Sequence, residues 1–300
     1  MKSTPDLAQA EAHAATRLHL ECQAPFDLAH LLTFLGQRSV AGVETVNQDS
    51  YRRGFRLAGR PGWFEVRAQR GATGLELAVH HPSPGAARQV GARVRRMFDL
   101  DADAHAIRGV LAGDPLLGPL NTRWPGQRVP GAFEPFEMAV RAVLGQQVSV
   151  AAARTLAARI ATTYGARLPV ALHAGVDRLF PEPAALVDAP LEALGVMPTR
   201  AACLRHLARA VADGQLRFDP AQPLEAFVDA FTRLPGIGPW TAHYIALRAL
   251  SKRDAFPAAD LVLRRHAGRG RVLRARELEA LSQAWRPWRA YAVMLLWRAG

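Results

Sequence analysis

Lysine is almost absent from this sequence. Of the 38 Lys and Arg residues, only Lys2 and Lys252 are lysines, so arginine supplies nearly all of the positive charge. The 26 acidic residues leave a formal net charge of +12. A genome rich in G and C would explain the missing lysines but not this net charge. Because guanidinium groups stay ionised and match phosphate geometry, the excess favours a nucleic acid as partner over a merely basic surface.

Cysteine and long apolar segments are scarce as well. Cys22 and Cys203 are too few for a disulfide framework, a four-thiolate cluster or a structural zinc site. The ten histidines show no metal-binding spacing, so we expect neither a metal nor a cofactor. No run of 18 apolar residues occurs, and the first twenty residues lack the apolar core of a signal peptide. We therefore expect a cytoplasmic protein, associated with the nucleoid when it acts.

The chain length of 300 residues and its 49% hydrophobic content predict a folded protein of two domains. Residues 1–16 are expected to be a mobile leader. Residues 17–110 mix helical and strand periods: WFEVRAQ and LELAVHH are typical of strands, and residues 84–99 of an amphipathic helix. This region is predicted to be a small α+β domain with an antiparallel sheet.

Residues 111–300 are predicted to be entirely helical. Strand patterns end near residue 105, and Pro and Gly residues between 113 and 131 separate the sheet domain from a series of helices rich in Ala, Leu and Arg. The expected helices are 135–147, 149–164, 182–188, 190–195, 199–213, 224–233, 239–250, 260–267, 276–284 and 287–298.

The segment LPGIGPWTA, residues 234–242, predicts a helix-hairpin-helix turn. Gly236 and Gly238 permit tight backbone geometry, and Pro239 suits a first helical position. The free N–H groups at the start of the second helix form an anion site that can hold a phosphate without reading bases. An ordinary turn between helices is the alternative.

The hairpin is followed by AFPAADLVLRR, residues 255–265, in which Asp260 also suits a helix N-cap. This order of hairpin, short loop and aspartate resembles the 3-methyladenine DNA glycosylase II family of helix-hairpin-helix DNA glycosylases. The resemblance extends over residues 17–298. It is also carried by the segments FDLAHLLTFLGQRSVAGVETV, FEMAVRAVLGQQVSVAAARTLAARI and AWRPWRAYAVMLLWR.

The resemblance implies a TATA-binding-protein-like sheet domain before two helical lobes, residues 135–252 and residues 111–134 plus 253–300. It also implies a monomer that flips alkylated bases, of the 3-methyladenine and 7-methylguanine type, out of double-stranded DNA. The enzyme would hydrolyse the N-glycosidic bond and leave an abasic site. A non-catalytic DNA-binding protein and a glycosylase for deaminated purines are the alternatives.

The resemblance also assigns site residues. Asp260 would stabilise the oxocarbenium-like transition state. Relatives that also cut the strand carry a Schiff-base lysine where this chain has Trp240, so no lyase activity is expected. Tyr291 shares a helical face with Trp288 and Leu295 and could instead be core. The expected base pocket consists of Trp240, Tyr244, Tyr291 and Trp297.

The expected DNA contacts lie at the hairpin and at two neighbouring segments. Gln147 departs from the family, whose enzymes have an apolar wedge there; glutamine could fill the gap or be exposed without a role. A monovalent cation on the backbone carbonyls of Leu234 and Ile237 is a further implication. The DNA-binding residues are Gly236, Ile237, Gly238, Thr241, Gln146, Gln147 and Arg264, with Arg248, Lys252, Arg253, Arg265, Arg269 and Arg271 near phosphates or on a solvated helix face.

Overall fold

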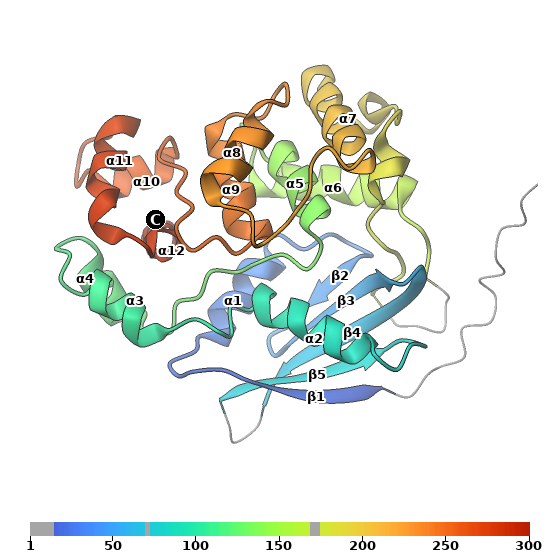
Figure 1. Cartoon of the computed structure of the whole chain (residues 1–300), viewed down its shortest axis with the longest axis horizontal. Helices are drawn as coiled ribbons and strands as arrows, with labels where there is room; N and C mark the ends of the chain where they lie inside the picture. Colours follow the sequence, from blue (N-terminus) through green and yellow to red (C-terminus); the bar gives the residue numbers. More distant parts are fainter. Residues whose placement is uncertain (1–14, 70–72, 169–174) are drawn as a thin grey trace, which may run out of the picture.

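The computed structural model describes residues 15–69, 73–168 and 175–300. All but the last two positions of the expected leader, residues 1–16, therefore lie outside the described residues. In Figure 1 a sheet with two helices forms the lower part of the molecule, two short helices (residues 104–123) lie beside it, and most of the remaining helices lie above. The elements in chain order are β1 (Thr16–Glu21), α1 (Leu28–Gly36), β2 (Glu44–Val46), β3 (Ser50–Leu57), β4 (Arg60–Ala68), β5 (Gly74–His80), α2 (Ala86–Met97), α3 (Ala104–Leu111), α4 (Leu117–Arg123), α5 (Pro135–Leu144), α6 (Val150–Tyr164), α7 (Pro198–Ala212), α8 (Leu224–Thr232), α9 (Pro239–Ala249), α10 (Leu261–Ala267), α11 (Ala275–Ser282) and α12 (Arg289–Ala299), with short 3-10 helices at Pro183–Leu186, Leu191–Leu194 and Gln283–Trp285.

The N-terminal sheet is antiparallel throughout, in the order β1-β5-β4-β3-β2. Alternation along β5 places Leu75, Leu77 and Val79 on the face that α1 and α2 cover. Between these positions Glu76 lies on the other face, where it pairs with Arg17 of β1 at 2.6 Å. A sheet with one apolar and one polar face explains why its strands show a period of two. The predicted α+β fold is confirmed.

Strand β3 was not expected, because an arginine occupies one of its inward positions. Arg53 is 2% exposed and lies between Tyr51 and Phe55, which face the same core. Its guanidinium contacts Glu44 on β2 at 3.4 Å and forms a second ion pair with Glu137 on α5. Buried charges are tolerated when they are paired in this way. The arginine that hides the strand pattern therefore joins the sheet to the helical region.

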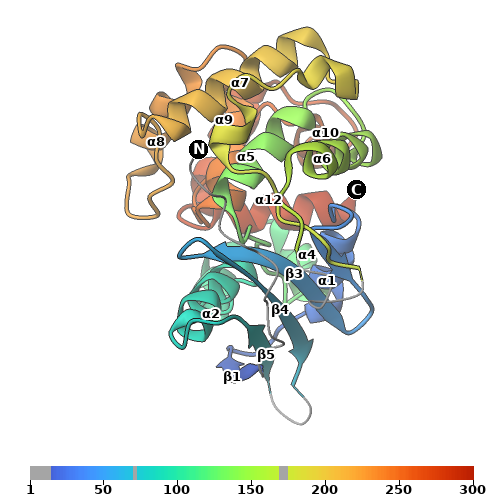
Figure 2. The same cartoon turned by 90° about the vertical axis from the view of Figure 1, so that its right-hand side faces the viewer.

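The helical region contains every helix expected from the sequence, two of them as 3-10 turns. Two additional short helices occur, α3 just before and α4 within the segment of Pro and Gly residues between 113 and 131. Helix α4 packs on α12, α3 packs on α4 and on the 3-10 helix Gln283–Trp285, and Ile107, Leu111 and Leu117 belong to the helical core. In Figure 2, α12 runs at the level between α5 and α6 above and the sheet below. Residues far apart in the chain therefore meet around α12.

Candidate active site

The two glycines of the hairpin have different structural surroundings. Gly236 has a φ of +89°, and a Cβ built on it would lie 2.9 Å from both Cβ and Sγ of Cys203 on α7. Gly238 has a φ of −90°, and a Cβ there would meet no atom within 4 Å. The protein itself therefore requires glycine at position 236 but not at 238. Cys203 is 2% exposed, and burial raises the pKa of its thiol to about 11.

The turn leaves the first backbone amides of α9 without an intrahelical acceptor. The Ile237 amide donates to the Leu234 carbonyl at 3.1 Å, and the Ile237 side chain is buried. The first bond of α9 is donated by Ala242 to the Gly238 carbonyl. The amides of Trp240 and Thr241 precede that bond, so they have no intrahelical acceptor. The cation proposed from the resemblance on the Leu234 and Ile237 carbonyls stays a prediction.

Gln146, at the end of α5, braces the hairpin from inside. Its Nε2 donates to the Gly236 carbonyl at 2.9 Å and to the Thr241 hydroxyl at 3.0 Å. Thr241 is only 3% exposed. The hydroxyl is therefore turned into the protein, and the expected contact of Thr241 with DNA stays a prediction that would rest on its backbone amide. The side-chain amide nitrogen of Gln146 likewise donates both of its hydrogen bonds to groups of the protein.

Gln147 lies in the turn between α5 and α6 and is exposed, with a φ of +55°. Its neighbour Val148 is 37% exposed. Ser149 then caps α6, because its side chain accepts from the Ala152 amide at 3.2 Å. A glutamine with positive φ is uncommon, and the turn presents it outward. Its role as the wedge stays a prediction.

Asp260 is the N-cap of α10, and three N–H groups point at its carboxylate. Oδ1 accepts from the Leu263 amide at 3.0 Å and from Nε1 of Trp297 at 3.3 Å. Oδ2 accepts from Nε1 of Trp240 at 3.0 Å. Capping and site geometry therefore coexist at this residue, as the sequence allowed. Donors from α9, α10 and α12 hold the carboxylate in one orientation.

A cavity of about 470 Å³ opens beside this carboxylate, and Trp240, Tyr244, Trp297 and Asp260 line it. The Trp240 and Tyr244 rings stack with centroids 5.3 Å apart and planes 6° apart. The Tyr244 and Trp297 rings are tilted by 57° at 6.0 Å. Helices α9, α10 and α12 thus bring an aromatic surface and a fixed carboxylate to one cavity.

Tyr291 does not belong to this cavity, and the expectation that it lines a base pocket is wrong. It is 3% exposed and packs against Trp288 with ring centroids 5.6 Å apart. Its hydroxyl donates to Oδ2 of Asp99 at 2.8 Å. Tyr291 shares its face of α12 with Trp288 and Leu295, and these residues are core, which was the alternative interpretation; residues 289–296 of this helix are all buried.

Comparison with known protein families agrees with this geometry. The family model described as HhH-GPD superfamily base excision DNA repair protein matches residues 140–290, and the AlkA N-terminal domain model matches residues 17–134. The chain belongs to the HhH-GPD superfamily of base excision DNA repair proteins. Within the helical region, the match covers the hairpin, Asp260 and the first residues of α12.

Individual relatives extend the HhH-GPD assignment over most of the chain. DNA-3-methyladenine glycosylase 2 of Escherichia coli is 34% identical over 93% of this chain and 95% of its own length. The probable bifunctional transcriptional activator/DNA repair enzyme AlkA of Mycobacterium tuberculosis is 36% identical over 96% of this chain, which spans only 58% of that protein. The structure of 3-methyladenine DNA-glycosylase from Archaeoglobus fulgidus shares the fold, with a TM-score of 0.80, 21% identity and coverage of 94% and 97% of the two chains.

Arginines also line the cavity of this HhH-GPD protein. The sequence indicated none of them as a cavity residue. Arg248 had been expected near phosphates, but it is 3% exposed. Its guanidinium donates to the Pro130 carbonyl and, at 3.1 Å, to the Tyr244 hydroxyl. Burial lowers the Arg248 pKa to about 10. The arginines that line the cavity are Arg38, Arg141, Arg154 and Arg248.

The charge around Tyr244 follows from these arginines. Burial by itself would raise the pKa of this phenol. The guanidinium groups of Arg248, Arg38 and Arg141 outweigh burial and hold the pKa below its ordinary value. The cavity of this HhH-GPD protein therefore combines an aromatic wall with a strongly positive one.

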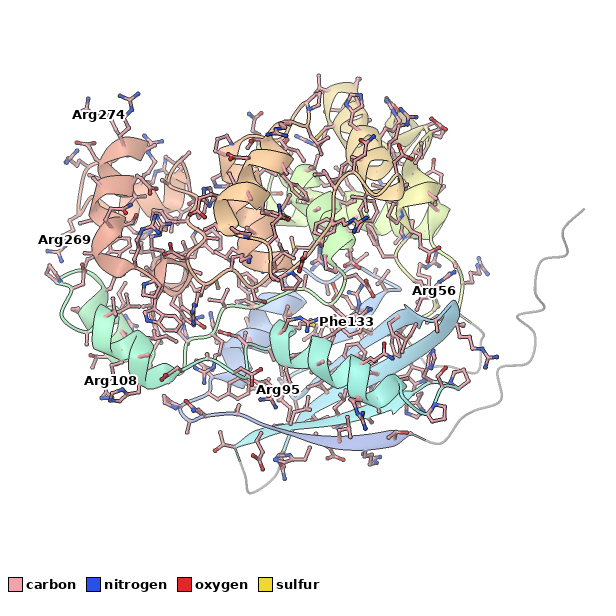
Figure 3. The ribbon with its side chains drawn as sticks, viewed as in Figure 1. Arg56, Arg95, Arg108, Phe133, Arg269 and Arg274 are labelled. Atoms are coloured by element: carbon pink, nitrogen blue, oxygen red, sulfur yellow. The ribbon has the colours of Figure 1, made fainter. Side chains whose placement is uncertain are left out.

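Other cationic residues near the hairpin donate hydrogen bonds to backbone carbonyls of the protein. Arg264 is half-buried, and its Nε donates to the Leu273 carbonyl at 2.5 Å. Lys252 donates to the carbonyls of Pro220, at 2.6 Å, and Gln222. Arg269 donates to the Pro115 carbonyl and lies at the outer edge of the molecule, as does Arg274 (Figure 3). Their contacts with phosphates stay predictions.

Residues 15–69, 73–168 and 175–300 contain neither a candidate membrane span nor a candidate metal site. No helix in these ranges is long and apolar enough to cross a bilayer. No group of three or more His, Cys, Asp or Glu side chains in them could hold a metal ion.

Proposed function

We propose that this chain is a DNA glycosylase that removes alkylated bases, of the 3-methyladenine and 7-methylguanine type, from double-stranded DNA and leaves an abasic site. The observation that carries the proposal is the Asp260 carboxylate, held by three N–H donors on the wall of an aromatic cavity. The hairpin that offers backbone amides to a phosphate begins the helix that supplies Trp240. Backbone anchoring and chemistry are thus joined by one helix.

The reaction follows from what a fixed carboxylate can do beside a flipped nucleotide. As the bond between C1′ and the base breaks, its electron pair leaves with the base and positive charge develops on the sugar. Asp260 stabilises that charge, and its three donors fix the carboxylate before the reaction starts. Water then adds to C1′ and loses a proton to solvent. The products are the free base and an abasic site.

The aromatic wall accounts for base acceptance. A base must leave the duplex before its sugar can reach Asp260, and stacked aromatic faces receive it. An alkylated purine that carries positive charge is attracted to such faces by about 0.5 to 2 kcal/mol. The Trp240 and Tyr244 rings stack on each other with their planes 6° apart, and both line the cavity that would receive the base. Stacking without hydrogen bonds to the base edge accepts related bases, so we expect a broad substrate range.

Gly238 supports the hairpin's role in DNA binding. Its backbone conformation is open to any residue, and no protein atom restricts a side chain there. The protein's own packing therefore does not account for glycine at this position. Close approach of a DNA phosphate to the N-terminus of α9 does account for it. Such a contact holds the duplex without reading its sequence.

The same proposal includes three finer points. The enzyme acts as a monomer in the cytoplasm. It has no lyase activity, because Trp240 occupies the position of the Schiff-base lysine in strand-cutting relatives. Gln147, exposed between the cavity residues Gly145 and Val148, fills the gap left by the flipped nucleotide.

Base release tests the proposal directly. The chain is incubated with duplex DNA treated with a methylating agent, and the released bases are identified by chromatography. We expect free 3-methyladenine and 7-methylguanine. DNA binding without any released base would support the non-catalytic alternative. Release of hypoxanthine from a parallel duplex that contains it, without release of either methylated base, would support the other alternative.

A further inference from the structure

The cavity carries more positive charge than excision of a cationic base requires. Among the residues that line it, four arginines accompany a single acidic side chain, that of Asp260. A purine made cationic by methylation is attracted by aromatic faces but repelled by guanidinium groups in a partly desolvated site. The aromatic wall and the positive wall therefore favour different bases.

The guanidinium groups of two of these arginines already have partners within the protein. Nη1 of Arg141 pairs with Glu44 at 3.0 Å and with Glu137 at 2.9 Å, so two carboxylates balance its charge. Arg248 directs its donors at backbone carbonyls and at the Tyr244 hydroxyl. Neither guanidinium is free to turn toward a bound base.

The other two cavity arginines, Arg154 and Arg38, differ in how far their side chains are exposed to solvent. Arg154 is exposed, and its Nη1 donates to the Gln37 carbonyl at 3.4 Å, so water screens its charge. Arg38, just after the end of α1, is half-buried. Its guanidinium carbon lies 3.7 Å from the centroid of the Phe34 ring, and Nη1 donates to the Phe34 carbonyl at 3.2 Å.

Arg38 is held in place without a balancing anion. Within the described part of the chain, no carboxylate forms an ion pair with it, in contrast to Arg141. Burial lowers the Arg38 pKa, the charge of Arg141 adds to this effect, and Tyr244 opposes it. The guanidinium nevertheless stays protonated at neutral pH. A fixed, partly desolvated cation thus lines the cavity and offers hydrogen-bond donors to whatever occupies it.

We propose that Arg38 donates hydrogen bonds to the departing base and favours neutral lesions over cationic ones, an inference that rests on the proposed glycosylase function. When the C1′–N bond of a neutral base breaks, the bonding pair leaves as negative charge on the base. Arg38 stabilises this anion, which then takes a proton from solvent, while water adds to C1′ and releases one. A cationic methylated purine departs as a neutral molecule and gains nothing from the guanidinium.

The N-terminal domain acquires a chemical role from this inference. Arg38 is its contribution to the cavity, and the ion pair between Glu44 and Arg141 fixes the sheet domain against α5 beside it. The domain therefore contributes the residue that would act on the departing base to the same cavity as the carboxylate that would act on the sugar.

Single-turnover release of two bases from otherwise identical duplexes tests the inference. One is hypoxanthine, a neutral deaminated purine, and the other is the cationic 7-methylguanine. In Arg38→Gln we expect the ratio of the hypoxanthine rate to the 7-methylguanine rate to fall by about tenfold or more. Arg38→Lys keeps the charge without the planar fork and should retain an intermediate ratio.

Arg154→Gln is the matched control, since it removes an exposed cavity arginine and should leave the ratio within about twofold of wild type. Thermal unfolding checks that each variant is folded. If Arg38→Gln does not fold, the ratio measured for Arg38→Lys tests the inference instead.

An unchanged ratio in a folded Arg38 variant, or equal loss of both rates, would overturn the role of Arg38. So would a wild-type chain that releases 7-methylguanine but no hypoxanthine. A wild-type chain that releases neither base would instead refute the proposed function and this inference with it.

Discussion

The indole N–H of Trp240, in the first turn of α9, donates a hydrogen bond of 3.0 Å to Oδ2 of Asp260 at the start of α10. One end of this bond belongs to the helix that follows the hairpin, and the other is the carboxylate proposed to act on the sugar. Because α9 is also the helix whose amides face a phosphate, DNA docking and carboxylate position are mechanically connected.

Replacing Asp260 by Asn should lower base release by about 10³-fold or more, since the charge that stabilises the sugar is lost. Asparagine caps helices as well as aspartate does, so α10 should persist and DNA affinity should stay within about threefold. Single-turnover release and DNA titration measure the two effects. Undiminished release in the variant would contradict the mechanism.

Asp103→Asn provides the matched control for this substitution. Asp103 also caps a helix, since its side chain accepts from the Ala106 amide at 2.9 Å, but it lies at the start of α3 and does not line the cavity. Its substitution should leave base release unchanged. A similar loss in both variants would point to a general effect of removing N-cap charge.

Borohydride should not trap the protein on damaged DNA while it releases bases. Trp240 cannot form a Schiff base, and the amine of Lys252 is held by two carbonyls of the segment before α8. A strand-cutting glycosylase with the hairpin lysine serves as the positive control. A covalent adduct in proportion to turnover would show that the enzyme is bifunctional.

The two hairpin glycines should respond differently to alanine. Gly236→Ala places a methyl group against Cys203 at a positive φ, so it should lower the free energy of unfolding by more than about 1 kcal/mol. Gly238→Ala should leave stability nearly unchanged but weaken binding to damaged and undamaged duplex alike. It should also reduce the salt slope of binding by about one unit.

Thermal unfolding and salt-dependent titration, run on both variants, separate these outcomes. Loss of stability without loss of affinity in Gly238→Ala would mean that this glycine serves only the turn. A loss of affinity confined to damaged DNA would move Gly238 into the base pocket.

The pair between Tyr291 and Asp99 predicts a pH dependence of stability. Burial raises the Asp99 pKa to about 6, although the Val129 amide and the Tyr291 hydroxyl oppose the shift. Because the folded pKa exceeds the unfolded value, the contribution of Asp99 to stability is complete below about pH 4 and is lost as the pH rises through 6. Relative to wild type, Asp99→Asn should therefore gain up to about 2 kcal/mol between pH 4 and pH 7.5.

Chemical denaturation of both proteins across this pH range measures the difference. A stability difference that stays constant with pH would contradict the raised pKa.

Features with a local signal could be predicted from the sequence. The hairpin, the capping aspartate and the amphipathic helices follow from glycine, proline and apolar spacing within one turn or two. The patterns of β4 and β5 were equally clear, because their buried positions are apolar. By contrast, β3 carries Arg53 inward, and its partners Glu44 and Glu137 are known only from the fold.

The site was predictable only where its residues follow one another in the chain. Asp260 and Trp240 belong to neighbouring segments with a recognisable order. Arg38 is contributed by a different domain, and no local feature distinguishes it from the many other arginines. The prediction for Tyr291 was wrong because an aromatic residue on a helical face has the same spacing whether it lines a cavity or fills a core.

The contact between Gly236 and Cys203 has a chemical consequence apart from packing. Thiolates, not thiols, react with electrophiles, and burial raises the pKa values of both Cys203 and Cys22. Both sulfurs are therefore kept in their unreactive form at neutral pH. A methylating agent that reaches this protein therefore meets few thiolates on it.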